Sequence, residues 1–198
     1  MSERIRPTAI ENTGVRSRVL AAAAQLLATH AADDLSLRTI AETAGVGLAS
    51  IYHYFAGKEE LMLCLAVEGL ETLRRDILAG QTDPEIASPM RGGHRAYFSF
   101  LRTKPALFSL MFNERMLSHH AELRESENKA FLAYQSAVQA DSRIPPKHQE
   151  NAARAIWALG RGMAAMNSSH PDGQLPPEIA EKLSAGALYL IDHRRDED

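Results

Sequence analysis

The sequence predicts an all-α protein in which a three-helix head precedes a larger helical body. Apolar residues recur three or four positions apart through most of the chain, which is the spacing of one face of a helix. No stretch alternates apolar and polar residues as a half-buried strand would. Prolines and glycines gather between the periodic stretches, most clearly in the segments IPPK and HPDGQLPP. The chain therefore divides into a head over residues 1–58 and a body over residues 59–198.

The head begins with a polar tail over residues 1–12, which is predicted to be disordered away from a partner. A first helix is expected from about residue 13 to 29. Ser36 is a good N-cap for the next helix. The body begins with a long helix over about 58–79, which ends before Gly80 and Pro84. Prolines then punctuate further helices near 87–102, 105–112, 114–140, 147–168 and 177–194.

Residues 36–58, SLRTIAETAGVGLASIYHYFAGK, carry the pattern of a helix-turn-helix. Apolar residues repeat at helical spacing up to Ala44, Gly45 breaks the pattern, and the repeat resumes at Val46. Gly45 can adopt the positive φ that a tight turn needs. The residues that lie off the buried stripe of the second helix would meet a DNA groove, and they are Gly47, Leu48, Ala49, Ser50, Tyr52 and His53. An ordinary helical hairpin is the structural alternative.

Composition favours an intracellular globular protein. The chain has 198 residues, of which 45% are hydrophobic and 24% are charged, so it can bury a sizeable core. It shows no apolar run long enough for a signal peptide or a membrane span. The single cysteine, Cys64, excludes an internal disulfide framework, and we expect a cytoplasmic location. The formal net charge is −3 and the head is close to neutral, which supports nucleic-acid binding only weakly.

These residues resemble the TetR family of ligand-responsive transcriptional repressors. The resemblance is carried by Ile40-Ala41, Ala44-Gly45-Val46, Ser50-Ile51-Tyr52, Phe55, Lys58 and Glu60-Leu61. The body resembles, more loosely, a subgroup with a tryptophan followed four residues later by a His-Gly pair. Here Trp157 and Gly162 are present, and Arg161 stands where that histidine would be.

The resemblance implies roles for particular residues on DNA. Ser50 and Tyr52 would contact phosphates, as would Ser36, Thr39 and Lys58, and His53 would face base edges or the backbone. Many members carry Ser-Lys where this chain has Gly47-Leu48, so one cation is lost. Leu48 and Ala49 could instead contact thymine methyl groups. For Leu48, a solvent-exposed leucine or one near a dimer contact is an equal alternative.

The body is expected to dimerise, because one small head reads too few base pairs and two heads would read a palindromic operator. Two apolar and small-residue faces near the C-terminus are the candidate interface, made of Ile156, Leu159, Gly160, Met163, Leu183, Ala187 and Leu190. The alternative is that these faces pack only within one subunit.

Aromatic residues and methionines cluster in the body and suggest a site for a small hydrophobic or aromatic effector. The candidate lining residues are Tyr97, Phe98, Phe108, Met111, Phe112, Trp157 and Arg161. Arg161 is singled out because it is a charge in an otherwise apolar, small-residue helix. Ordinary core packing is the alternative for the aromatic residues.

The sequence therefore predicts a homodimeric DNA-binding transcriptional regulator, and the resemblance implies that it is a repressor whose DNA affinity is lowered by its effector. It shows no glycine-rich phosphate loop, zinc-ligand spacing or nucleophile elbow, so no enzymatic activity, metal or cofactor is expected. The alternative function is a helical adaptor that binds another protein and never DNA. The near-neutral head and Leu48 favour that alternative slightly, whereas the register of the hairpin opposes it.

The salt dependence of DNA binding is predicted to be shallow. If Lys58, Arg4 and Arg6 of each subunit release a counterion, a dimer neutralises about six phosphates and the log–log slope is about −5. Deleting residues 1–12 should flatten the slope, which is measured by titrating DNA at several salt concentrations. An unchanged slope would show that the tail does not contact DNA.

Overall fold

The computed structural model describes residues 9–170 and 175–192, and all regular structure in these ranges is helical. The chain divides into two compact units, Met1–Leu65 and Ala66–Asp198. Within the described ranges, no helix combines the length and the apolar character that crossing a bilayer requires. The predicted all-α fold is therefore confirmed. The functional division after residue 58 stays a proposal.

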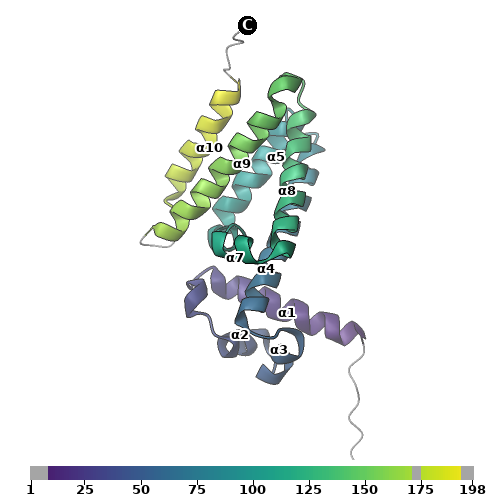
Figure 1. Ribbon diagram of the computed structural model, residues 1–198, viewed down its shortest axis with the longest axis vertical. Helices are drawn as coiled ribbons and strands as arrows, with labels where there is room; N and C mark the ends of the chain where they lie inside the picture. The colour runs from purple at the N-terminus through teal and green to yellow at the C-terminus, as the bar shows by residue number, and fades with distance from the viewer. Residues whose placement is uncertain (1–8, 171–174, 193–198) are drawn as a thin grey trace, which may run out of the picture. The chain divides into compact units, whose positions relative to one another are not determined.

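The first unit contains α1 (Ala9–Leu27), a 3-10 turn at Ala32–Asp34, α2 (Leu37–Ala44) and α3 (Leu48–Tyr54). α1 packs against both short helices (Figure 1). Residues from all three helices and from the segment after α3 form its core, including Val19, Leu20, Ile40, Ile51 and Phe55. α1 begins at Ala9, so the last part of the predicted disordered tail is helical, while residues 1–8 lie outside the described residues.

The long helix α4 (Lys58–Gln81) begins in the first unit and continues into the second. Its buried stripe follows the predicted spacing through Leu61, Leu65, Leu70, Leu73 and Ile77. One unbroken helix therefore belongs to both units.

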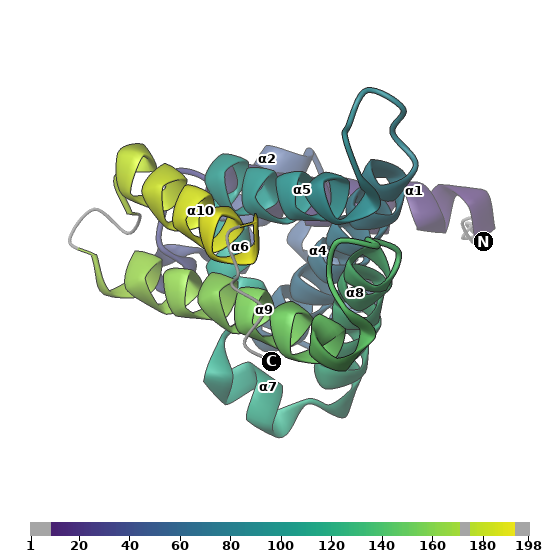
Figure 2. The same ribbon diagram turned by 90° about the horizontal axis from the view of Figure 1, so that it is seen from above.

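Six further helices complete the second unit. They are α5 (Pro89–Thr103), α6 (Pro105–Met111), α7 (Glu114–His119), α8 (Ala121–Gln139), α9 (Pro146–Ser169) and α10 (Pro177–Asp192). α9 packs against α6 and α8, and α10 lies beside α9 and α5 (Figures 1 and 2). The helices α5, α6 and α9 each begin with a proline, which is favoured at the first helical position, so the sequence predicts where they begin.

The predicted single helix over 114–140 is wrong, because the chain breaks at His120. This residue has φ −116° and ψ 108°, which is extended backbone. The Arg124 guanidinium donates to the carbonyl groups of Leu117 and Ser118 at 2.6 and 3.0 Å, so it satisfies carbonyls that the break leaves open. Two helices, α7 and α8, result.

Tyr97 lies at the centre of the body core. Its ring stacks on Trp157 with centroids 4.8 Å apart, and its hydroxyl donates to the Trp157 carbonyl at 3.1 Å. A Cβ atom on Gly160 would lie 2.1 Å from the Tyr97 hydroxyl oxygen, so this approach of α5 to α9 needs a glycine. Burial raises the pKa of Tyr97 well above its ordinary value, which keeps the phenol neutral as a donor.

A buried carboxylate joins the loop between α8 and α9 to the start of α5. Asp141 accepts from the Arg143 guanidinium at 2.6 and 2.9 Å and from the Ser88 hydroxyl at 2.8 Å. Ser88 also accepts from the backbone amide of Arg91 as the N-cap of α5. The Arg143 side chain, with Ser88, lowers the pKa of Asp141 from 3.8 to about 2.

Asp141→Asn is predicted to destabilise the body at neutral pH. Because the folded-state pKa of Asp141 is depressed, its contribution is complete above about pH 4 and disappears as the pH falls through 2. Denaturant unfolding should show a loss of about 1–2 kcal/mol at pH 7 and almost none near pH 2. Asp76→Asn, at an exposed position of α4, is the control. An equal loss at both pH values would contradict the electrostatic account.

Candidate nucleic-acid interface

The geometry of the helix-turn-helix follows from three capping residues. The Ser36 hydroxyl caps α2 by accepting from the Thr39 amide at 3.1 Å. Gly45 ends α2 in the left-handed region with φ 63° and ψ 39°, and its amide donates to the carbonyls of Ala41 and Glu42. Gly47 is the N-cap of α3 with ordinary extended angles. The sequence expectation of a positive φ at Gly45 is thus confirmed.

Apolar anchors fix the rotation of each short helix. Ile40 and Ala41 of α2 and Ile51 of α3 are almost completely buried, and Phe55 closes the end of α3. Because Ile51 faces inward, residues one or two positions away from it must face outward.

The outward face of α3 contains the predicted contact residues. Leu48 is 40% exposed and Tyr52 is 57% exposed, which is unusual for large side chains of these types. Gly47, Ala49 and His53 are also exposed, and Ser50 is half-buried. The His53 ring meets the edge of Tyr54 at 5.0 Å. This face combines a flat aromatic ring, small residues and polar groups, which suits close approach to a groove.

The three predicted contacts outside α3 are accessible to different degrees. Ser36 and Thr39 are exposed, and their hydroxyl oxygens are 2.8 Å apart. Lys58 is half-buried, and its ammonium group donates to the Asp33 carbonyl at 2.8 Å. Lys58 therefore also ties the start of α4 to the 3-10 turn. This hydrogen bond joins residues 25 positions apart, so no local sequence pattern predicts it.

Arg16 of α1 is a head residue that sequence reasoning did not single out. Its guanidinium lies over the Phe55 ring, 5.7 Å from the centroid, so it covers the end of the head core. Arg38, by contrast, is exposed and pairs with Glu42 at 3.3 Å. Because Arg16 precedes Phe55 by 39 positions, no short-range sequence pattern predicts their contact.

The predicted effector residues are brought together as a packed core. Tyr97, Phe108, Met111, Phe112 and Trp157 are buried, with Phe108 and Phe112 centroids 4.7 Å apart. Phe98 differs, because it also lines a cavity between α5 and α10. Arg161 is partly exposed and pairs with Glu127 at 3.4 Å, and the same carboxylate accepts from the Trp157 indole at 3.3 Å. An effector site at these residues stays a prediction.

Four of the seven predicted dimer residues are buried within a single subunit, so they are not available to a partner in this conformation. Ile156, Gly160, Met163 and Ala187 are buried within the body, and Gly160 packs on Tyr97. Leu159 and Leu183 are half-buried, and the side chain of Leu190 lies outside those described. Small and apolar residues occur on all sides of α9, so the sequence pattern could not distinguish its inner face from its outer face.

Among the described residues, no group of three or more histidine, cysteine, aspartate or glutamate side chains is arranged to hold a metal ion. A compact head with an exposed recognition helix, followed by a separate helical body, defines the class of helix-turn-helix DNA-binding regulators.

Comparisons with known proteins identify the family. Residues 19–65 match the family described as bacterial regulatory proteins of the tetR family, and residues 90–186 match the tetracyclin repressor-like C-terminal domain. These two matches together cover most of the chain. The chain belongs to the tetR family, and it is a DNA-binding transcriptional repressor rather than an enzyme. This result favours the predicted regulator over the adaptor, while the Trp…His-Gly subgroup is not confirmed.

Solved structures share the fold. A bacterial regulatory protein of the tetR family from Rhodococcus RHA1 is 21% identical with a TM-score of 0.64, and the match covers 89% of this chain and 96% of that chain. LfrR from Mycobacterium smegmatis, solved in complex with proflavine, is 22% identical with a TM-score of 0.65, covering 91% and 96%. NalD from Pseudomonas aeruginosa, the secondary repressor of the MexAB-OprM multidrug efflux pump, is 21% identical with a TM-score of 0.54, covering 89% and 96%.

Gly45→Ala is predicted to destabilise the head by about 1–2 kcal/mol, because a Cβ is strained in the left-handed region. Gly47→Ala is the matched control, since its φ of −71° suits any residue and its Cβ would meet only the Ser50 hydroxyl at 3.9 Å. Thermal unfolding followed by circular dichroism measures both. Equal losses would show that the positive φ is not the source of the effect.

Proposed function

We propose that this repressor acts as a homodimer on a palindromic operator, with α3 in the major groove, and that a small hydrophobic or aromatic effector lowers its DNA affinity. The observation that carries the proposal is the exposed face of α3. Tyr52 and Leu48 stay in solvent although Ile51, between them, is fully buried. Holding large apolar groups in water is unfavourable unless a partner covers them.

The proposed contacts to DNA are of two kinds: contacts to phosphates position the protein, and contacts to bases read the sequence. The proposed phosphate contacts, which would set the register on DNA, are Lys58 and the hydroxyls of Ser36, Thr39, Ser50 and Tyr52. Leu48 and Ala49, in the first turn of α3, would contact thymine methyl groups, and His53 would reach a base edge or the backbone. Gly47 lets the backbone at the start of α3 approach the duplex closely.

A second subunit is proposed to cover the outer faces of α9 and α10. On α9, the exposed residues Ala155, Ala158, Gly162 and Met166 follow one another at helical spacing. On α10, Gly186 and Tyr189 are exposed, and a Cβ on either Gly162 or Gly186 would meet nothing within 4 Å. Small residues let helix backbones approach closely, and two helices from each subunit would form a four-helix interface. Leu159 and Leu183 flank this surface.

Effector action is proposed to work through α4, which runs without a break from Lys58 to Gln81. The ligand would favour a body conformation in which the two heads are wrongly spaced for the operator. It then lowers the affinity for DNA, and DNA lowers the affinity for the ligand by the same factor. LfrR, which shares this fold, was solved in complex with the small molecule proflavine. Because the target is DNA in a bacterial regulatory family, we propose that the protein acts in the cytoplasm.

Selection from a random DNA library at moderate salt is predicted to enrich a palindrome for the full-length protein. Tyr52→Ala should abolish enrichment, because it removes both the phosphate-contacting hydroxyl and the ring. Tyr52→Phe is the matched variant: it keeps the ring and should retain the same palindrome with about tenfold weaker binding, as expected for one charge-assisted hydrogen bond. No enrichment by an intact dimer would contradict operator binding and return the adaptor to consideration.

Gly162→Glu is predicted to convert the dimer to a monomer, because it places a charge in the proposed interface. Sedimentation velocity measures this change. Leu132→Glu on α8 is the control, since Leu132 is also exposed but lies outside the proposed surface. Dimers that persist in Gly162→Glu, or that dissociate in Leu132→Glu, would place the interface elsewhere.

A further inference from the structure

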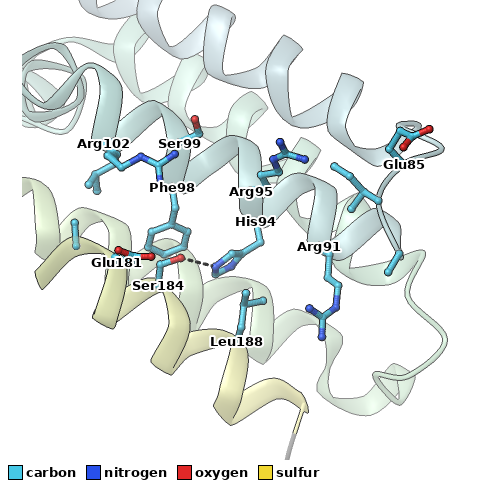
Figure 3. A pocket seen from close by; sticks show the side chains of 14 residues that line it. Glu85, Arg91, His94, Arg95, Phe98, Ser99, Arg102, Glu181, Ser184 and Leu188 are labelled. Carbon is cyan, nitrogen blue, oxygen red and sulfur yellow. Dashed lines mark hydrogen bonds between the residues drawn. The ribbon is translucent and has the colours of Figure 1, made fainter. Parts of the chain in front are cut away.

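A cavity of about 450 Å³ lies between α5 and α10 (Figure 3). This volume falls within the usual range for small-molecule sites. α5 forms one wall, α10 forms the facing wall, and the segment before α5 lines one end. The stacked rings of Tyr97 and Trp157 do not line it, so it is distinct from the packed aromatic core. We call it the α5–α10 cavity.

A hydrogen bond fixes how the two walls face each other. The Nε2 atom of His94 in α5 and the Ser184 hydroxyl of α10 lie 2.9 Å apart, and His94 is 3% exposed. From this contact, Phe98 and Arg102 follow at intervals of one helical turn along α5, and Glu181 lies about one turn before Ser184 on α10. Figure 3 shows Arg102 and Glu181 toward the same end of the cavity, and the Phe98 ring projects from α5 toward α10.

Arg102 and Glu181 place opposite charges on facing walls of the α5–α10 cavity. Both side chains are exposed and both line the cavity. Within residues 9–170 and 175–192, neither side chain forms an ion pair with the other or with a further residue. One wall therefore offers guanidinium N–H donors, and the facing wall offers carboxylate oxygens as acceptors.

The surface beside these two charges is apolar. Phe98 is 7% exposed, and its ring centroid lies 4.4 Å from that of His94 and 5.3 Å from that of Tyr97. Leu101 and Ala180 also line the cavity and are buried. The accessible part of the Phe98 ring therefore belongs to a packed surface, against which another aromatic ring can lie.

We propose that the α5–α10 cavity binds an aromatic α-amino acid in its zwitterionic form. The carboxylate of the amino acid accepts hydrogen bonds from the Arg102 guanidinium, its ammonium group donates to the Glu181 carboxylate, and its ring lies on Phe98. A ligand with only a negative group would meet Glu181 as a like charge, and a ligand with only a positive group would meet Arg102 as a like charge. The two walls together therefore select a molecule that has both charges.

This inference goes beyond the proposed repressor mechanism. It needs neither DNA nor a second subunit, because every residue that it uses lies within one body. Of the residues predicted to hold the effector, only Phe98 lines the α5–α10 cavity.

The test compares three compounds that share one phenyl group and differ in charge: L-phenylalanine, phenethylamine and phenylpropionate. Isothermal titration calorimetry of the full chain at neutral pH is expected to show saturable binding of one L-phenylalanine per chain. Phenethylamine, which lacks the carboxylate, and phenylpropionate, which lacks the ammonium group, should each bind at least about tenfold more weakly. Binding of either analogue as tight as that of L-phenylalanine would overturn the proposal, as would no saturable binding of L-phenylalanine.

Each charge is tested by a variant and by the compound that lacks the matching group. Arg102→Gln should weaken L-phenylalanine binding about tenfold without weakening phenethylamine binding, because phenethylamine has no carboxylate. Glu181→Gln should weaken L-phenylalanine binding by a similar factor without weakening phenylpropionate binding. Arg154→Gln is the control, because Arg154 is an exposed arginine of α9 that pairs with Glu150 outside the cavity, and it should bind within about twofold of wild type. Wild-type affinity in both Arg102→Gln and Glu181→Gln would contradict the proposal.

NMR of the backbone amides of the full chain locates the bound L-phenylalanine independently of the variants. The largest shift changes are expected at residues 98–102 and 180–184, and amides of α8 should change little. Changes confined to other helices would place the ligand elsewhere and overturn the proposal. Because Arg102 and Glu181 are exposed, their variants should keep the thermal transition of wild type. Operator selection is independent of these results, so failure of the cavity proposal and failure of the DNA proposal are distinguishable.

Discussion

The exposed face of α3, which we propose binds DNA, depends on the left-handed turn at Gly45. α2 and α3 are short helices of eight and seven residues, and neither would be stable alone in water. They hold each other because the turn lets Ile40 and Ile51 enter one core. Because Ile51 faces this core, Leu48 and Tyr52 remain exposed to solvent. A residue with a side chain at position 45 would strain the turn and disturb the orientation of the whole recognition surface.

The body is closed by packing between aromatic residues of different helices. Tyr97 stacks on Trp157 directly above Gly160, and this contact closes α5 onto α9. The aromatic residues are therefore already in contact with one another. Open space remains instead between α5 and α10, where arginines line the rim. α10 lines this space on one side and has the exposed Gly186 and Tyr189 on another.

Sequence patterns predicted most of the fold because its determinants are local. Capping by Ser36, the break at Gly45 and the proline starts of the body helices each act within a few residues. The break at His120 was missed, since Arg124 satisfies the open carbonyls through a contact that has no periodic signature. The buried side of α9 has no clear sequence signature for a similar reason: small residues occur all around that helix, and contacts with distant residues such as Tyr97 decide which side is buried. The contact of Lys58 with the Asp33 carbonyl also arises from tertiary packing alone, as does the cavity between α5 and α10.

The most direct test of the central claim is an NMR titration of the full chain with its selected operator, following the backbone amides. Binding through the exposed face of α3 predicts the largest shift changes at residues 47–53, with smaller ones at residues 36, 39 and 58. Amides of α8, which belongs to the body alone, should change little at the same DNA concentration. Changes concentrated in the body, with residues 47–53 unaffected, would contradict the account.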